Sequence, residues 1–294
     1  MFGAVISFAA MQISGRELSG EHDAITIMLY RGLIGVALML PIALTFGGVD
    51  NVITRRPLGH LVRNIVHFLG QFSWFYGVAH LALADVTALN SVMPIFGVIL
   101  AVIFLGERFT WPRLIVILCG FVGVLIVVRP GMVPMEVATS ITLVGALCYA
   151  ASVVMVKALT ITEPPLRIVF YMMAMQCAFA LTFTGGHVAT PTVAELPWIA
   201  VVGISGLTAH YCMAKSVSFA DASVVMPINF LALPVMAAMG YAFYGEDLDP
   251  YTLGGGGLVL GATYLNIAWA RRRAMAAPRA LVMSGDTDGQ PPRV

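Results

Sequence analysis

The sequence predicts an all-α integral membrane protein with ten transmembrane helices, arranged as two inverted five-helix repeats. Three observations predict this fold: the composition, the spacing of long apolar runs, and a repeat of residues between the two halves. Of the 294 residues, 59% are hydrophobic and 11% charged, with a mean hydropathy of +0.90. Soluble domains carry about 25% charged residues, so this composition excludes an ordinary soluble domain or a disordered chain. The net charge of +1 offers no basic field for nucleic acid.

The apolar runs are long enough to span a bilayer, which takes roughly 20 helical residues. They are continuously apolar rather than alternating, which excludes the strands of a membrane barrel. Glycine, proline and charged residues mark the joints between the runs. We expect helices at residues 1–17, 25–46, 63–82, 86–105, 112–128, 141–158, 166–184, 197–215, 222–244 and 253–271.

Positive charge is distributed unevenly between the two sides of these helices. With the N-terminus inside, thirteen of the sixteen Lys and Arg residues, Arg63 among them, fall on joints of the inner side. Cytoplasmic joints carry the excess of Lys and Arg, so we expect both termini in the cytoplasm of a bacterial-type inner membrane.

The two halves of the chain repeat each other at shifts of 136–141 residues. The matching pairs are Arg16 and Lys157, Tyr30 and Tyr171, Gly70 and Gly206, Asn90 and Asn229, and Glu107 and Glu246. Because each half has five spans, the second half is expected to be inverted relative to the first, as in many alternating-access transporters. We expect a first repeat at 1–133, a second at 134–273, and a disordered cytoplasmic tail at 274–294.

Several motifs resemble the EamA type of the drug/metabolite transporter superfamily. They are Leu83-Ala84-Asp85 before Met93-Pro94, Leu105-Gly106-Glu107-Arg108, Gly120 to Pro130, Ala220-Asp221-Ala222-Ser223-Val224-Val225-Met226-Pro227 and Tyr244-Gly245-Glu246. The similarity covers roughly residues 1–273 and implies a transporter of two five-helix repeats. The segment from Lys157 to Tyr171 resembles the branch that contains riboflavin and S-adenosylmethionine importers.

The helix expected at 63–82 carries a polar stripe. Asn64, His67, Gln71 and Trp74 follow one another at spacings of three, four and three residues, so they share one face. We interpret this face as the lining of a solute cavity, with the alternative that the side chains only form interhelical hydrogen bonds. On the helix expected at 197–215, His210 and Tyr211 are the counterparts and are also expected to bind substrate.

A second group of candidates lies near prolines in the helices expected at 86–105 and 222–244. Asn90 and Asn229 are expected to contact the solute, and Pro94, Pro227 and Pro234 to act as hinges, because an interior proline leaves a backbone carbonyl unpaired. The alternative is a tolerated kink whose freed carbonyl is satisfied by a neighbouring serine.

Three further residues are candidates for substrate binding. Tyr149 and Gln176 fall near the middle of their helices. Arg31 has two interpretations: its side chain extends to the lipid headgroups from a helix end, or it binds a substrate carboxylate or phosphate. A salt bridge from Arg31 to Asp85 or Glu246 is a further alternative.

The sequence also contains informative absences. No Asp or Glu falls in the middle of an expected span, which argues against a permanent cation as cargo and against proton coupling through a carboxylate. His67 or His210 could still carry a proton. No metal-binding or nucleophile motif occurs, and the four cysteines are interpreted as small buried hydrophobes.

These observations predict a transporter, not an enzyme, without cofactor or metal. The expected solute is a small neutral or zwitterionic metabolite, heterocyclic or amino-acid-like, with import slightly favoured through the branch resemblance. An exporter of amino acids or metabolites is the alternative, and an integral membrane enzyme acting on a lipid-linked substrate is a distant one. The expected partners are the solute and membrane lipids, without nucleic acid, and a homodimer is left open.

Overall fold

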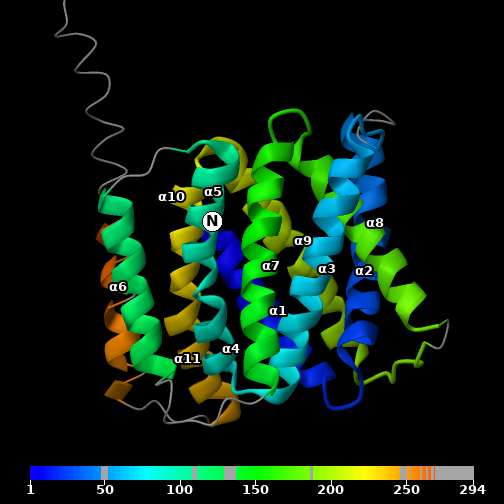
Figure 1. The fold of residues 1–294 in the computed structure, drawn as a ribbon. Coiled ribbons are helices and arrows are strands. Elements are labelled where there is room, and N and C mark those ends of the chain that lie inside the picture. The colour runs from blue at the N-terminus through cyan, green and yellow to red at the C-terminus, as the bar shows by residue number, and fades with distance from the viewer. Residues whose placement is uncertain are drawn as a thin grey trace, which may run out of the picture.

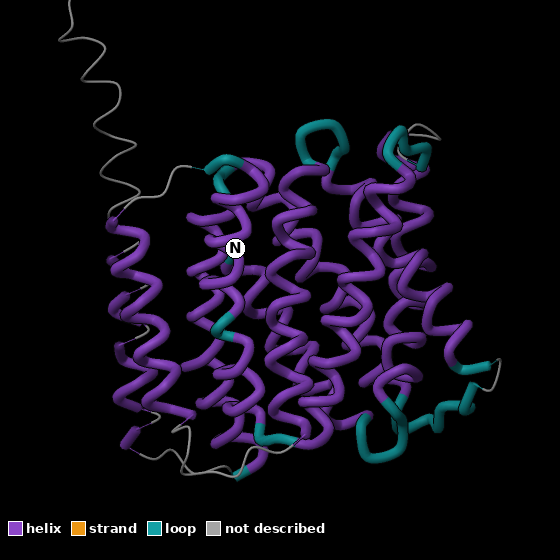
Figure 2. Tube along the Cα trace, in the orientation of Figure 1, coloured by secondary structure: helices purple, strands orange, loops and turns teal. Residues whose placement is uncertain are grey.

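The computed structural model describes residues 1–47, 52–107, 111–128, 137–185 and 188–245, and most of 250–268. Long helices lie side by side with roughly parallel axes, and the described residues contain no strand (Figures 1 and 2). This confirms the all-α prediction. The helices are α1 (Phe2–Leu18), α2 (Ala24–Gly47), α3 (Pro57–His80), α4 (Leu83–Asn90), α5 (Met93–Leu105), α6 (Trp111–Val128), α7 (Val137–Leu159), α8 (Pro165–Phe183), α9 (Leu196–Phe219), α10 (Ala222–Val225), the 3₁₀ helix η2 (Met226–Leu231) and α11 (Ala232–Tyr244).

Five helices in the described part of the chain are long and apolar enough to cross a membrane. They cover Ala24–Ile42, Asp85–Leu105, Val137–Leu159, Pro165–Phe183 and Leu196–Phe219. Many large apolar side chains on the outside of the bundle are exposed, for example Phe104 at 72% and Phe183 at 67%. Soluble monomers rarely expose so much apolar surface, whereas lipid-facing helices require it.

Two sequence-predicted spans are interrupted near the prolines at which kinks were expected. The span expected at 86–105 is divided into α4 and α5, although Asp85–Leu105 together is long and apolar enough to cross a membrane, and the one expected at 222–244 consists of α10, η2 and α11. Pro94 and Pro227 stand in the first positions of α5 and η2, where proline is tolerated because its missing N–H has no helical partner. Pro234 lies in the first turn of α11.

The structure corrects the expected start of α3. The helix begins at Pro57 rather than at residue 63, and its N-cap is Arg56. Arg63 therefore does not lie on a joint but almost two turns inside the helix, where it is 4% exposed. The helix expected at 253–271 is described only in part, and the expected tail at 274–294 lies outside the described residues.

The closest helix packing joins the first half of the chain to the second. Helices α3 and α7, α1 and α9, and α2 and α8 pack against each other along their lengths. Glycines permit the close approach: a Cβ on Gly70 would stand 3.2 Å from the backbone N of Tyr149, and one on Gly206 would stand 2.9 Å from Cδ of Arg31. The core of the bundle thus lies between the halves.

Matching residues of the two halves make matching contacts. Arg16 Nη1 donates to the carbonyl oxygens of Val78 and Leu81 at the end of α3, at 2.6 and 2.8 Å. Lys157 Nζ donates to those of Val217 and Ala220 at the end of α9, at 2.8 and 3.0 Å. A cation on the last carbonyls of a helix also complements the helix dipole. Likewise, Gly106 and Gly245 end α5 and α11 in the same left-handed conformation, with φ of 65° and 63°.

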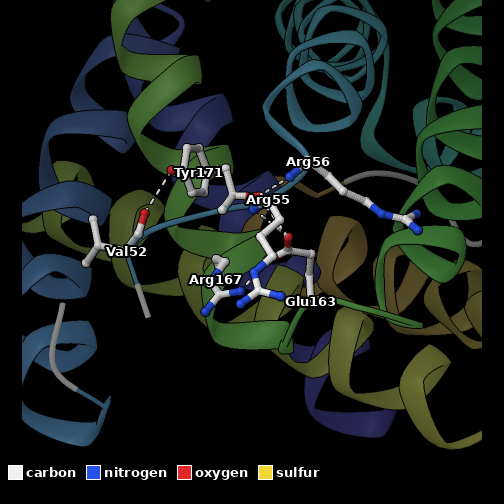
Figure 3. A network of polar contacts seen from close by, with 7 residues as sticks. Val52, Arg55, Arg56, Glu163, Arg167 and Tyr171 are labelled. Carbon is white, nitrogen blue, oxygen red and sulfur yellow. Dashed lines mark hydrogen bonds and ion pairs between the residues drawn. The ribbon is translucent and has the colours of Figure 1, made fainter. Parts of the chain in front are cut away.

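At two corresponding places, a tyrosine hydroxyl bonds to a connection between helices of the opposite half. The hydroxyl of Tyr171 on α8 donates to the carbonyl of Val52, before α3, at 2.8 Å (Figure 3). The hydroxyl of its counterpart Tyr30 on α2 donates to the carbonyl of Ala189, before α9. Each tyrosine therefore fastens the connection that leads into a helix of the opposite half.

Candidate functional site

A cavity of about 110 Å³ lies between the two halves of the bundle. Side chains from α1, α3, α4, α7, α8 and α9 line it, together with residues at the breaks between α4 and α5 and along η2. Six sequence-predicted residues are brought together there, although they come from five different spans. They are His67, Trp74, Asn90, Tyr149, His210 and Asn229.

Helix α3 supplies the longest row of lining residues. Arg63, His67 and Trp74 face the cavity from one stripe of this helix. At 1.5 Å per residue, Arg63 and Trp74 are about 16 Å apart along the helix axis. The stripe therefore places a cation toward one end of the cavity and a large aromatic ring toward the other.

The middle of the cavity is formed by rings that contact one another edge to face. The ring of His67 lies 4.8 Å from that of His210 and 5.3 Å from that of Tyr149, measured between centroids. Phe8 on α1 contacts His210 at 5.2 Å. The hydroxyl of Ser152 lies 3.3 Å from Nδ1 of His67. These contacts hold the two imidazoles in place at the cavity.

Four polar atoms of the lining have no hydrogen-bond partner among the described residues. They are Nε of Arg63, Nε2 of His67, the hydroxyl of Tyr149 and Nε2 of His210. A buried polar atom without a partner costs about 1–3 kcal/mol, so native proteins retain few of them, and those few often have a functional role. Four such atoms on one cavity are suited to a polar ligand.

Four sequence-predicted residues do not line the cavity. Gln71 and Arg31 are both fully buried behind it, and Nη2 of Arg31 donates to Oε1 of Gln71 at 2.5 Å. Gln176 is fully buried and donates to the backbone carbonyl of Asn64 at 3.0 Å. Tyr211 follows His210 on α9 and therefore points to a different face, where it is 37% exposed.

The structure also corrects the alternatives considered for Arg31. Its side chain is fully buried and does not extend to the lipid headgroups. Its guanidinium bonds to Gln71 and to the sulfur of Met173 at 4.0 Å, and Asp85 is not among its partners. Glu246 lies outside the described residues. The positive charge that reaches the cavity belongs to Arg63 instead.

Sequence reasoning missed several lining residues. Arg63 was missed because a charged residue at the edge of an apolar run is easily assigned to a joint. Gln12 on α1 was missed although it is an amide within an apolar helix, a recognisable signal; in the structure its Nε2 donates to the carbonyl of Leu83 at 2.9 Å. Apolar lining residues such as Met172 carry no signal that distinguishes them from packing.

No acidic residue is found among the described lining residues. The described residues also contain no cluster of three or more His, Cys, Asp or Glu that could hold a metal ion. Glu107 has a structural contact, since its Oε1 accepts the backbone N–H of Ala222 at the start of α10 at 2.9 Å. The chemistry of the cavity is therefore hydrogen bonding, ring stacking and one positive charge.

A polar cluster outside the cavity joins the connection before α3 to the connection between α7 and α8. We call it the Glu163 network; it comprises Thr54, Arg55, Glu163 and Arg167 (Figure 3). The carboxylate of Glu163 accepts hydrogen bonds from Thr54 at 2.8 Å, from the backbone N–H of Arg55 at 3.3 Å and from Arg167 at 2.7 Å. Burial alone would raise the pKa of Glu163, but these bonds and the charge of Arg167 outweigh it and lower the pKa below its ordinary value.

The connection before α9, to which Tyr30 donates a hydrogen bond, has a different pair of interacting side chains. Nε2 of His22, between α1 and α2, lies 3.3 Å from a carboxylate oxygen of Glu195, just before α9. His22 and Glu163 occupy corresponding positions in the two halves, eight residues before Tyr30 and Tyr171. The two connections therefore use the same positions with different chemistry.

Comparison with known proteins agrees with this fold. The model of the EamA-like transporter family matches residues 1–129 and again residues 138–268. A solved crystal structure superposes with a TM-score of 0.76 at 16% identity, over 92% of this chain and 96% of that chain, which shows a shared fold.

Named relatives are also transporters. The S-adenosylmethionine uptake transporter of Rickettsia bellii is 26% identical over 273 residues, 93% of each chain. The pseudopaline exporter CntI of Pseudomonas aeruginosa is 27% identical over 269 residues, 87% of this chain and 90% of the relative. The riboflavin transporter of Rhizobium johnstonii is 29% identical over 218 residues, 74% of this chain and 72% of the relative.

A bundle of apolar helices around an internal cavity, lined mainly by apolar residues with a few polar side chains among them, is the architecture of a multi-pass membrane transporter. The chain belongs to the EamA-like transporter family, within the drug/metabolite transporter superfamily. The family and the names of the relatives indicate transport of a small molecule rather than catalysis.

Proposed function

We propose that this chain carries a small heterocyclic or amino-acid-like metabolite across a bacterial-type inner membrane, through the cavity between its halves. The observation that carries the proposal is the convergence of unpartnered polar atoms from Arg63, His67, Tyr149 and His210 on one buried space. Intramembrane polar groups are expensive and are retained where they bind a solute. Trp74 supplies an aromatic surface on which a flat ring can stack.

The solute class is supported by the relatives. Two of the three relatives described above are named for compounds with a flat heterocyclic ring, S-adenosylmethionine and riboflavin. The names "uptake transporter" and "exporter" both occur among the relatives. We propose import as the direction of transport, because the uptake transporters match along 93% of the chain.

We further propose that transport occurs by alternating access between two inverted five-span repeats, 1–133 and 134–273, with both termini in the cytoplasm. The matched contacts of Arg16 and Lys157, and of Tyr30 and Tyr171, support a repeat. Because each half has an odd number of spans, equivalent contacts fall at opposite ends of the bundle. Releasing one end while holding the other would open the cavity to one side of the membrane, with the breaks at Pro94, Pro227 and Pro234 as hinges.

The experiment is uptake by the purified chain in sealed liposomes. We expect labelled S-adenosylmethionine, which has both a heterocyclic ring and a carboxylate, to accumulate without product formation, and labelled riboflavin is the neutral comparison. Trp74→Ala and Asn229→Ala should each lower the initial rate about tenfold, because each removes a lining side chain. Tyr211→Ala is the matched control, since this tyrosine is exposed on α9 next to a lining residue.

Two outcomes would contradict the proposal. One is normal uptake by both lining variants, which would place the solute elsewhere. The other is loss of uptake in Tyr211→Ala equal to that in the lining variants, which would show that the effect does not depend on the cavity.

A further inference from the structure

We propose that the transported solute carries an anionic oxygen group, a carboxylate or phosphate, and that Arg63 binds this group in the cavity. The proposal deepens the transport function proposed above and names the chemical class of the solute. It rests on the position of Arg63, on the way its guanidinium is held, and on the absence of a competing acid among the described lining residues.

Arg63 is buried yet reaches the cavity. Its side chain is 4% exposed and belongs to the lining, together with His67 and Trp74 of the same helix. A buried cation in a membrane protein normally pairs with an acid or with backbone carbonyls. The described lining contains no Asp or Glu, and the hydrogen bond found for the Arg63 guanidinium is to a neutral amide, the side chain of Asn64.

Three other cations of the described residues provide an internal comparison; Arg31, whose Nε is also unpartnered but which does not line the cavity, is considered separately below. Arg16 and Lys157 each donate to two backbone carbonyls, and Arg167 pairs with the carboxylate of Glu163. These three have structural partners. Arg63 makes one hydrogen bond within the described structure, from Nη1 to Oδ1 of Asn64 at 3.0 Å, and its Nε has no partner there. A guanidinium has five N–H donors, so most of its capacity is available to a ligand.

The guanidinium is also held in a fixed orientation. Asn64 donates from Nδ2 to the carbonyl of His60 at 2.8 Å, so that its Oδ1 is directed to Arg63. Gln176 on α8 donates to the backbone carbonyl of Asn64 at 3.0 Å and to its Oδ1 at 3.4 Å. Asn64 and Gln176 are therefore positioning residues, and a preorganised guanidinium loses less conformational entropy when it binds an anion.

Arg31 contributes a second positive charge near the site. It is fully buried, and its partners Gln71 and Met173 are both uncharged. Because Coulomb interactions are strong at low dielectric, an unneutralised charge behind the cavity raises the positive potential inside it. An anion in the cavity would be attracted by both arginines, although only Arg63 can contact it.

The spacing of the lining residues Arg63, His67 and Trp74 on α3 indicates the shape of the solute. With Arg63 and Trp74 about 16 Å apart along the helix, the solute presents its anionic group at one end and a flat ring toward the other. His67, Tyr149 and His210 lie between them and offer hydrogen bonds to its polar middle. A zwitterion with a carboxylate satisfies this arrangement, whereas a solute that is only cationic does not.

The test compares matched acids and amides as ligands of the purified full-length chain. The probes are benzoate and benzamide, nicotinate and nicotinamide, indole-3-acetate and its amide, and riboflavin 5′-phosphate and riboflavin. Ligand-induced thermal stabilisation is measured for wild type, Arg63→Gln, Arg63→Lys and the control Lys215→Gln, which removes an exposed charge of α9. The phosphate pair distinguishes a phosphate-bearing solute from a carboxylate-bearing one.

We expect at least one acid to stabilise wild type and Lys215→Gln more than its neutral partner does. Arg63→Gln should weaken binding of that acid about 100-fold and leave the amide unaffected, because a buried charge-assisted pair is lost. Arg63→Lys should fall between the two, since lysine keeps the charge but not the paired donors. Without ligand, Arg63→Gln should melt no lower than wild type, because it removes an uncompensated buried charge.

Three results would overturn the proposal: no acid stabilises wild type more than its neutral partner, the acid preference survives in Arg63→Gln, or the ligand-free variant is strongly destabilised as a structural arginine would require. Failure of the transport function is a separate result. In that case liposome uptake of every solute would be absent while the acid preference and its dependence on Arg63 remained.

Discussion

The Glu163 network predicts how much folding stability is lost when the charge of Glu163 is removed, and how this loss depends on pH. Glu163 is 3% exposed and accepts three hydrogen bonds, two from side chains and one from a backbone N–H. Glu163→Gln keeps the shape but removes the charge that strengthens them. Charged hydrogen bonds contribute about 1.5–3 kcal/mol and neutral ones about 1 kcal/mol, so we expect a loss of about 2 kcal/mol at neutral pH.

The pH dependence has a definite sign. The pKa of Glu163 is lower in the folded protein than its ordinary value. A carboxyl with a lowered folded-state pKa contributes stability that is present above the unfolded pKa, about 4.3 for glutamate, and is lost as the pH falls through the folded pKa. The difference in melting temperature between wild type and Glu163→Gln should therefore be large at pH 7 and shrink in acid.

The assay is thermal unfolding of the purified protein in detergent at a series of pH values. A loss of about 2 kcal/mol corresponds to a shift of roughly 3 °C for a chain of this size. Glu21→Gln is the matched control because Glu21 is an exposed carboxylate on a connection between helices. The reasoning is refuted if Glu163→Gln melts like the control at pH 7, or if its deficit is the same at every pH.

Two other predictions concern the contacts between the halves. Gly206→Ala would place a Cβ 2.9 Å from Cδ of Arg31, so we expect it to lower stability by about 1–3 kcal/mol. The control is Gly254→Ala, for which no atom of the described residues lies within 4 Å of the added Cβ, and it should melt no lower than wild type. Equal melting of the two variants would contradict the packing. Tyr30→Phe and Tyr171→Phe each remove one hydrogen bond to a connection, and we expect them to shift cysteine labelling of the cavity in opposite directions across the membrane. A shift in the same direction in both would argue against an inverted arrangement.

Much of the fold could be predicted from the sequence because a membrane span must be apolar and about 20 residues long. Composition and run length therefore give the helices, and an internal repeat of residues indicates two halves. The interruptions between α4 and α5 and along η2 fall beside the prolines at which kinks were expected, but their form could not be predicted, since proline allows either a kink or a new helix start. Their geometry depends on neighbouring helices.

The site was only partly predictable, for a related reason. Helical spacing showed that His67, Gln71 and Trp74 share a face, but not how far each reaches. The Gln71 side chain accepts a hydrogen bond from Arg31. The Arg31 side chain has room for this contact because the residue beside it on α9 is Gly206, which has no side chain. Arg63 received no role because the sequence alone does not show that α3 begins at Pro57. Such assignments require knowledge of which helices are adjacent, and a single sequence does not supply it.

The central claim is that the cavity between the halves is reached alternately from the two sides of the membrane. The most direct test is labelling of Val153→Cys, an apolar lining position of α7 with no proposed binding role, by an impermeant thiol reagent applied to either side of sealed liposomes of known orientation. The variant is made in a chain whose four native cysteines are replaced. We expect labelling from both sides, and protection by any solute that the protein transports. Labelling from one side only, or labelling that a transported solute leaves unchanged, would contradict the account.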